Sequence, residues 1–479
     1  MMQQLQTQPN KHAKFFLTVA LVVGVLMIIL SPPMSTPDEN AHFLNAYSIS
    51  TGNLFPDQQD GNIGKFIPTY IYDYVVENLA RYSGSEFEPF SHTEFVMDSY
   101  LANGDGSQMF HASPLYAINP VGYLFSSLGM ALGRGITSIF EPHLADLPYN
   151  QLLFARMANL AFYIAVIYIS LRNTPKFQNT MLLVALMPMS IYLGSSVNYD
   201  ALIIPTSLLL ISELLRLLSR ETDRIEKRDI AIILFCTFFL ISVKFIYALL
   251  LLGLFILPIK KFGTTKFYFQ CIGMVVGVAL VAGIPFVLLQ FIQQGANANS
   301  YDVIAAHQSF VFSHLELMPR VFYNTIAKFY PYYFESFIGK LGALDTNFPV
   351  PFLVCFAVIL LVTALLEACQ CGIFSGFQWK RIFLLGGCLL TVAMIFIPMY
   401  LTWTPLPGIA DGVGTMYISG VQGRYFIPLV LPFLLCISNT CIPETWADRL
   451  RSPLFHVAAY TVVIFGILTS FLLLARYWL

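Results

Sequence analysis

Charged residues are scarce in this sequence. Only 11% of its 479 residues are charged, 26 Lys and Arg against 27 Asp and Glu, whereas soluble globular chains carry about 25%. A soluble enzyme of this length is excluded, because 57% apolar residues would leave too much hydrophobic surface in water. The same composition excludes a disordered chain, and the net charge of −1 excludes a nucleic-acid-binding protein. The remaining class is an all-α polytopic membrane protein.

Two further features are missing from the sequence. It has no Gly-rich phosphate loop and no G-x-G-x-x-G pattern, so we expect no nucleotide-binding domain. None of the eight cysteines lies in an expected extracytoplasmic loop, so we expect no disulfide framework. The C-x-C pair of Cys369 and Cys371 fits two buried small side chains better than a metal or acylation site.

Long apolar segments are abundant. A membrane-spanning helix needs about 20 mainly apolar residues, and eleven segments approach or reach this length. The first segment is followed by no small-x-small cleavage site, so we expect an uncleaved anchor. A twelfth apolar stretch, 114–133, contains Asn119-Pro120, which should break a helix. The expected spans are residues 15–31, 150–171, 180–196, 199–218, 230–243, 245–259, 268–292, 351–369, 382–402, 425–441 and 454–475.

Basic residues orient these spans, because cytoplasmic loops of membrane proteins are enriched in Lys and Arg. The segment 216–229 carries five basic residues and is therefore assigned to the cytoplasm. Alternation from this point places the N-terminus in the cytoplasm and the C-terminus outside. Residues 32–149 and 293–350 then form two large extracytoplasmic loops. The stretch 114–133 cannot cross, and it should lie in the membrane interface or dip into the membrane and return. We expect a multi-pass protein of the cytoplasmic (inner) membrane.

Acidic residues gather just after the first span. Thr36 suits a helix N-cap, and Glu39 would complete a capping box with it. Asp38 and His42 then lie four residues apart on one face of that helix. A carboxylate at a helix start stays ionised, which suits a general base, although it could also simply complement the helix dipole.

Four basic residues break the positive-inside pattern by lying on the outer side. A buried cation there needs an anion, and a lipid phosphate would serve, unless the side chains reach the headgroups or pair with acids. One of them, Arg424, lies beside Gly420 and Gly423, where the lack of side chains would let a ligand approach the backbone. Asp200, at the outer start of a span, either contacts a substrate or caps its helix. The four are His111, Arg156, Lys244 and Arg424.

Three motifs together resemble a bacterial family of multi-pass membrane proteins of unknown function. That family is similar to the GT-C superfamily of membrane glycosyltransferases, which includes protein mannosyltransferases, aminoarabinose transferases and oligosaccharyltransferases. The resemblance covers about residues 30–440 and implies a GT-C-like fold with interfacial helices in the first outer loop. The motifs are Pro37-Asp38-Glu39-x-x-His42, Ser196-x-Asn198-Tyr199-Asp200 and Gly420-Val421-Gln422-Gly423-Arg424-Tyr425-Phe426.

The resemblance implies a glycosyltransferase with a polyprenyl-phosphate sugar as donor and an envelope glycan, such as O-antigen, or a lipid-linked molecule as acceptor. Asp38 would be the general base of an inverting reaction, with Glu39 and His42 orienting it. No cofactor is assigned, and a divalent cation is left open. His111 matches less closely, since Ser113 replaces a proline of the related segment. The expected donor-binding residues are Arg424, Lys244, Arg156, His111, Gln422, Asp200 and Tyr425.

Two other functions fit the same residues. A lipid-linked sugar flippase or transporter would use the cations without chemistry, and it predicts an internal repeat, which we do not find. A polysaccharide polymerase or ligase would use a polyprenyl-pyrophosphate donor, which the sequence does not distinguish from a monophosphate.

Overall fold

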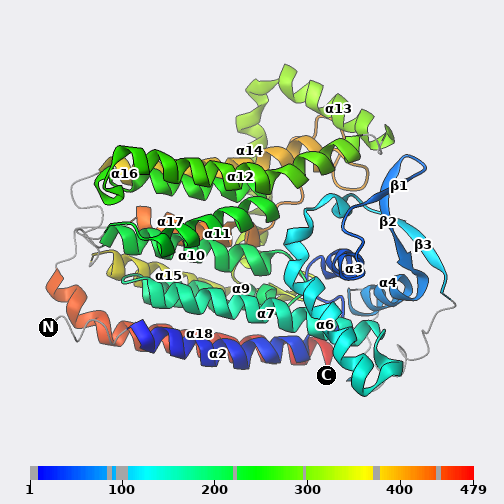
Figure 1. Ribbon diagram of the computed structural model, residues 1–479, viewed down its shortest axis with the longest axis horizontal. Helices are drawn as coiled ribbons and strands as arrows, with labels where there is room; N and C mark the ends of the chain where they lie inside the picture. Colours follow the sequence, from blue (N-terminus) through cyan, green and yellow to red (C-terminus); the bar gives the residue numbers. More distant parts are fainter. Residues whose placement is uncertain are drawn as a thin grey trace.

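The protein is a bundle of helices with a small mixed domain at one end (Figure 1). The computed structural model describes residues 9–83, 89–92, 106–219, 224–294, 298–369, 378–437 and 444–479. Within this part, seven helices are long and apolar enough to cross a membrane, which confirms a polytopic membrane protein. They are α2 (Pro9–Leu30), α7 (Pro148–Asn173), α10 (Asp200–Ser219), α12 (Thr265–Gln294), α15 (Val350–Cys369), α16 (Gln378–Pro398) and α18 (Glu444–Tyr477).

Four of the eleven expected spans do not form long regular helices. Segment 180–196 is split into α8 (Gln178–Ala185) and α9 (Pro188–Gly194), because Pro188 pushes Met187 into an extended conformation. The other three are short or irregular. They are α11 (Lys227–Val243), the 3₁₀ segment η4 (Phe245–Ile256), and α17 (Ile427–Cys436), which follows η8 (Gly423–Phe426).

The first outer loop folds into a compact unit at one end of the bundle (Figure 1). It holds helices α3 (Glu39–Ser50) and α4 (Thr69–Ser83) and an antiparallel sheet of three strands. The strands are β1 (Asp57–Gln59), β2 (Asn62–Pro68) and β3 (Gln108–Ala112), in the order β1-β2-β3.

The predicted break at Asn119-Pro120 is present. The stretch 114–133 consists of η1 (Pro114–Ala117), η2 (Pro120–Tyr123) and the start of α6 (Leu124–Phe140), and η3 (Pro142–Leu144) follows. The Asn119 side chain caps η2 by accepting from the backbone N–H of Val121 at 3.1 Å. Helix α6 packs closely on α7, because a side chain at Gly129 would meet the Phe154 carbonyl.

The second outer segment lies over the same end of the bundle (Figure 1). It comprises α13 (Ala298–Ser313), η6 (Leu315–Leu317), α14 (Met318–Ile338), β4 (Lys340–Leu341) and β5 (Thr346–Asn347). A loop that begins with the π-turn η7 (Met399–Trp403) leads from α16 to η8, and η8 packs against α14.

A cluster of buried polar residues joins the C-terminal ends of α7 and α10 to the N-terminal end of α11. Glu213 near the end of α10 accepts hydrogen bonds from Asn173 at 2.6 Å and from Arg216 at 2.5 Å. Arg216 also pairs with Asp229 in the first turn of α11. Since α10 begins at Asp200, this cluster lies about 20 Å along the helix from that residue. Helices α7 and α10 therefore end, and α11 begins, at the same end of the bundle, as the expected topology requires.

The cysteines form no disulfide among the described residues. Cys236, Cys271, Cys355, Cys388 and Cys436 are free. Cys371 of the C-x-C pair lies outside the described ranges.

Candidate functional site

The three sequence motifs meet where α10 begins and α11 ends. Asp38, from the first motif, forms an ion pair with Arg424, from the third. Asp38 is the N-cap residue of α3 and has a left-handed backbone with φ of 59°. This conformation is uncommon outside glycine, and such residues cluster at functional sites. The side chain of Asp38 is 49% exposed, so its carboxylate stays accessible while it contacts the buried arginine.

The backbone geometry corrects one detail of the sequence prediction. The helix begins at Glu39, and Asp38 occupies the N-cap position expected for Thr36. The Thr36 hydroxyl is buried and has no hydrogen-bond partner within the part of the chain that the structure describes, Glu39 included, so the capping box does not form.

Arg424 is buried and has unused hydrogen-bonding capacity. Its Nη2 pairs with Asp38, and its Nη1 lies 3.6 Å from the Oδ2 of Asp200, too far for a good hydrogen bond. Its Nε and Nη1 have no hydrogen-bond partner among the described residues. A buried guanidinium with unsatisfied donors is costly, and a bound anion would satisfy them.

Lys244 is the second cation of the site. It lies at the junction of α11 and η4, with its Nζ 3.7 Å from the ring centre of Tyr425 and 5.5 Å from that of Tyr199. The hydroxyl of Tyr247 donates to the Tyr425 carbonyl at 2.8 Å and holds this aromatic wall together. The described part of the chain places no carboxylate within 4 Å of the Lys244 ammonium, and the nearest groups are aromatic faces, while Asp200 and Asp38 act on it from farther away.

His42 packs against two aromatic residues, Tyr123 and Tyr199, next to the site. It is buried, its Nδ1 lies 2.8 Å from the hydroxyl of Tyr123, and its ring meets Tyr199 edge-on at 4.8 Å. Burial lowers the pKa of His42 to about 4, although the Asp38 carboxylate acts in the opposite direction. The imidazole is therefore neutral at physiological pH and links α3 to η2.

The positive charges near Asp38 favour the ionised form of its carboxyl group. Desolvation is the largest single influence and raises the pKa of this carboxyl, but the charges of Arg424, His42 and Lys244 and the hydrogen bond from Arg424 together outweigh it. The net result is a pKa below the usual value for aspartate. Asp38 is therefore ionised while the arginine faces it.

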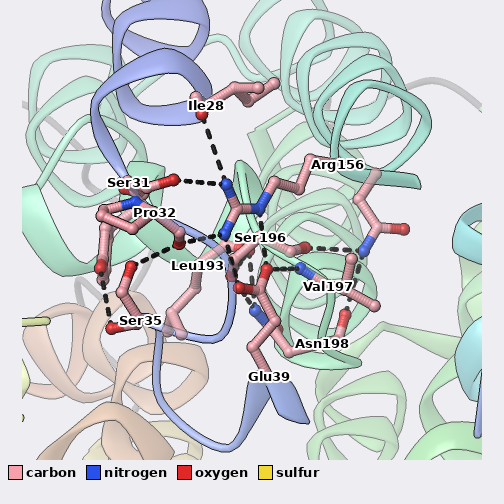
Figure 2. A network of polar contacts seen from close by, with 12 residues as sticks. Ile28, Ser31, Pro32, Ser35, Glu39, Arg156, Leu193, Ser196, Val197 and Asn198 are labelled. Atoms are coloured by element: carbon pink, nitrogen blue, oxygen red, sulfur yellow. Dashed lines mark hydrogen bonds and ion pairs between the residues drawn. The ribbon is translucent and has the colours of Figure 1, made fainter. Parts of the chain in front are cut away.

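Glu39 and Arg156 form a separate buried ion pair (Figure 2). Arg156 donates to both carboxylate oxygens of Glu39, at 2.9 and 2.5 Å. Its remaining N–H groups donate to the carbonyls at the end of α2 and in the following turn, those of Ile28, Ser31 and Pro32. Every donor of Arg156 is used, and this leaves none for the donor phosphate that the sequence analysis assigned to it.

Residues of the second motif hold Glu39 in place and cap α10. Its Oε1 also accepts from the backbone N–H of Val197 at 3.0 Å (Figure 2). Asn198 caps α10 by accepting from the N–H of Ala201 at 3.0 Å. Asp200 is therefore not required as the side-chain cap of α10, and its carboxylate faces Arg424.

His111 belongs to a different cluster. Its Nδ1 lies 2.8 Å from the hydroxyl of Tyr116, and it pairs across the sheet with Lys65. Lys65 is buried and donates to Asn45 on α3 at 3.0 Å. This cluster braces α3 against the sheet, and no contact in the described part of the chain joins His111 to Arg424.

The two glycines beside Arg424 serve protein packing. A side chain at Gly423 would meet the Tyr333 carbonyl of α14 at 1.9 Å, and the Gly423 N–H donates to Ser336 at 2.8 Å. Gly420 has φ of 86° and faces Trp403. The expected approach of a ligand to these glycines is thus replaced by contact with protein. Between them, the Oε1 atom of Gln422 is buried without a hydrogen-bond partner.

Aromatic residues that the sequence analysis did not select complete the site. Tyr199 contacts both His42 and Lys244, and Tyr123 holds His42 in place. Tyr199 lies inside the second motif, which could have indicated its role. Nothing in the sequence connects Tyr123 with residue 42.

The residues of the site do not fit a metal ion well. No group of three or more His, Cys, Asp or Glu side chains suited to a metal occurs in the described ranges. The guanidinium of Arg424 faces both Asp38 and Asp200, where a cation bridging those carboxylates would have to lie.

The fold and the site together define a multi-pass membrane protein with an ion-paired polar site at one end of its helices. The chain belongs to the family described as "Predicted membrane protein (DUF2142)", whose profile matches residues 21–433. The matched range includes all three motifs. No curated protein and no solved structure matches the chain.

Proposed function

We propose that this protein is a glycosyltransferase that moves a sugar from a polyprenyl phosphate to an acceptor hydroxyl. The observation that carries the proposal is the buried Arg424, which faces an exposed Asp38 and whose Nε and Nη1 find no hydrogen-bond partner in the described ranges. One group can bind a phosphate and the other can take a proton, and they are adjacent. The resemblance of the three motifs to GT-C enzymes favours the same reaction.

Arg424 and Lys244 bind the donor phosphate in this proposal. The open donors of Arg424 suit two phosphate oxygens, and Lys244 is a nearby cation whose closest described contacts are aromatic. Gln422, Asp200 and Tyr425 border the same place and contact the sugar or position the cations. Arg156 and Glu39 hold the turn that carries Asp38, and they act as positioning residues.

The reaction is a single displacement. Asp38 takes the proton of the acceptor hydroxyl while its oxygen attacks the anomeric carbon of the sugar. The bond from that carbon to the phosphate oxygen breaks, and its electrons pass to the phosphate, whose added negative charge Arg424 and Lys244 stabilise. The products are an inverted glycoside and a free polyprenyl phosphate. When the donor phosphate engages Arg424, Asp38 loses part of its ion pair and becomes a stronger base.

The proposed site lies on the outer face of the cytoplasmic membrane. The charge pattern of the loops predicts that the N-terminus is cytoplasmic and the C-terminus extracytoplasmic. It also predicts that residues 32–149, which include Asp38, are extracytoplasmic. A lipid-linked donor fits a chain with no recognisable nucleotide motif. The acceptor would be an envelope glycan or another lipid-linked molecule.

Reconstitution tests the proposal against its alternatives. Purified protein in vesicles is given radiolabelled polyprenyl-phosphate sugars with a crude envelope glycan fraction. Transfer of label to glycan supports the proposal. Movement of the labelled lipid across the bilayer without transfer would instead favour a flippase, and transfer only from long pyrophosphate-linked chains would favour a polymerase or ligase.

A further inference from the structure

An apolar cavity lies beside the proposed site, between α11, η4 and α12. Its volume is about 290 Å³, and its lining is made almost entirely of aliphatic and aromatic side chains. Two of the lining residues, Ala248 and Ala279, are small and leave the space that larger side chains would fill. An apolar cavity of this kind stays free of water and accepts an apolar ligand.

The cavity runs from the proposed site toward the opposite end of the helices. Ile241 and Phe245 line one part of it, and they stand on either side of Lys244 in the sequence. Ile230, near the start of α11, lines another part, as does Phe262. Residues 230 and 241 are eleven positions apart on one helix, which corresponds to about 17 Å.

The third wall of the cavity faces lipid. Along α12, Val276, Leu280 and Val281 are at least half exposed, although they lie in the middle of an apolar helix. In a bilayer these positions contact acyl chains. An apolar chain could therefore enter beside α12 directly from the membrane.

We infer that this cavity holds the isoprenoid chain of the donor, with the phosphate at Lys244 and Arg424. The inference rests on the proposed function and names where its substrate's tail lies. The polar end of such a lipid needs cations, and its single chain needs a narrow apolar channel. Here the apolar lining reaches Phe245, the residue that follows Lys244 in the chain. Because the tail comes from an equally apolar bilayer, the cations supply the affinity and the shape of the cavity selects the chain.

Photocrosslinking tests this placement without requiring any transfer. The probe is a polyprenyl phosphate, with no sugar, that carries a diazirine on its chain, and mass spectrometry locates the attachment. We expect attachment to residues of α11, η4 and α12 that line the cavity, including the segment around Cys271. Attachment mainly to other helices would overturn the inference.

A matched pair of variants on α12 sharpens the test. Ala279→Trp places an indole in the cavity, whereas a side chain at Gly277 meets nothing within 4 Å and should point into lipid. We expect Ala279→Trp to reduce attachment about tenfold, because the indole and the lipid chain cannot occupy the same space, and Gly277→Trp to leave it unchanged. Equal attachment in both variants would contradict the inference.

A second probe identifies the occupant. A diacyl phosphatidic acid with the same diazirine carries a comparable phosphate but two chains. Equal labelling of the cavity by this probe would show an ordinary phospholipid site and overturn the isoprenoid assignment. If the isoprenoid probe labels the cavity but no sugar is transferred, the cavity assignment stands and the proposed reaction fails.

Discussion

Asp38 and Arg424 are 386 positions apart in the chain, yet they form one ion pair at one end of the helix bundle. The pair is asymmetric, because the arginine is buried while about half of the Asp38 side chain remains exposed. Both partners of the Glu39–Arg156 pair are buried. The carboxylate of Asp38 is therefore accessible to a substrate, whereas that of Glu39 is not.

Removing Arg424 should destabilise the protein. Arg424→Gln leaves the buried carboxylate of Asp200 without its facing cation, and loss of one partner of a buried pair costs about 3–5 kcal/mol. The double variant Arg424→Gln with Asp200→Asn should recover part of this loss, because no uncompensated charge remains. Thermal unfolding in detergent measures both. A double variant no more stable than Arg424→Gln would show that Asp200 does not depend on the arginine.

Arg156 and Lys244, both expected from the sequence to bind phosphate, should give opposite results. Arg156→Gln should lower the unfolding temperature strongly, since it leaves Glu39 buried and unpaired, while the remaining folded protein keeps its affinity for polyprenyl phosphate. Lys244→Gln should keep the unfolding temperature and weaken lipid-phosphate binding about 10- to 100-fold, the loss of one charge-assisted contact.

Binding titrations with polyprenyl phosphate, made beside the thermal unfolding measurements, separate these two results. Reduced lipid affinity in folded Arg156→Gln would mean that this arginine contacts the phosphate after all. Unchanged affinity in Lys244→Gln would remove Lys244 from the site.

His42 should make the folded protein sensitive to acid. Burial lowers its pKa to about 4, against about 6.5 in an unfolded chain, while the charges that face it are Asp38, Arg424 and Lys244. Between these values the unfolded chain binds the extra proton, so stability falls as pH drops, by up to about 1.4 kcal/mol per pH unit. Unfolding temperatures of the wild type and His42→Gln at pH 7 and pH 5 test this. The wild type should lose more; an equal loss would show that His42 is not buried and neutral.

The sequence predicted the membrane class and the break at Asn119-Pro120, but it did not show which polar side chains pair with one another. Hydrophobic length and basic loops are local signals, so they identified α2, α7 and α10 directly. The different roles of Arg156 and Arg424 depend on contacts with residues far away in the sequence. Both are isolated outer cations in the sequence, and only the folded turn after α2 shows that Arg156 is saturated by carbonyls.

The irregular segments were the other limit of sequence analysis. Residues 245–259 are as apolar as a regular span, yet they form the 3₁₀ segment η4. Composition cannot report this, because the same side chains suit either helix. The roles of Gly420 and Gly423 were likewise undetermined until α14 and Trp403 were found against them.

The most direct test of the account is the rate of sugar transfer by purified Asp38→Asn beside the wild type. Asparagine tolerates the left-handed backbone at this position, so the variant should insert and fold while its side chain no longer accepts the proton. The account predicts normal binding of polyprenyl phosphate and a transfer rate lower by about 10²- to 10⁴-fold. Transfer at the wild-type rate by correctly folded Asp38→Asn would contradict it.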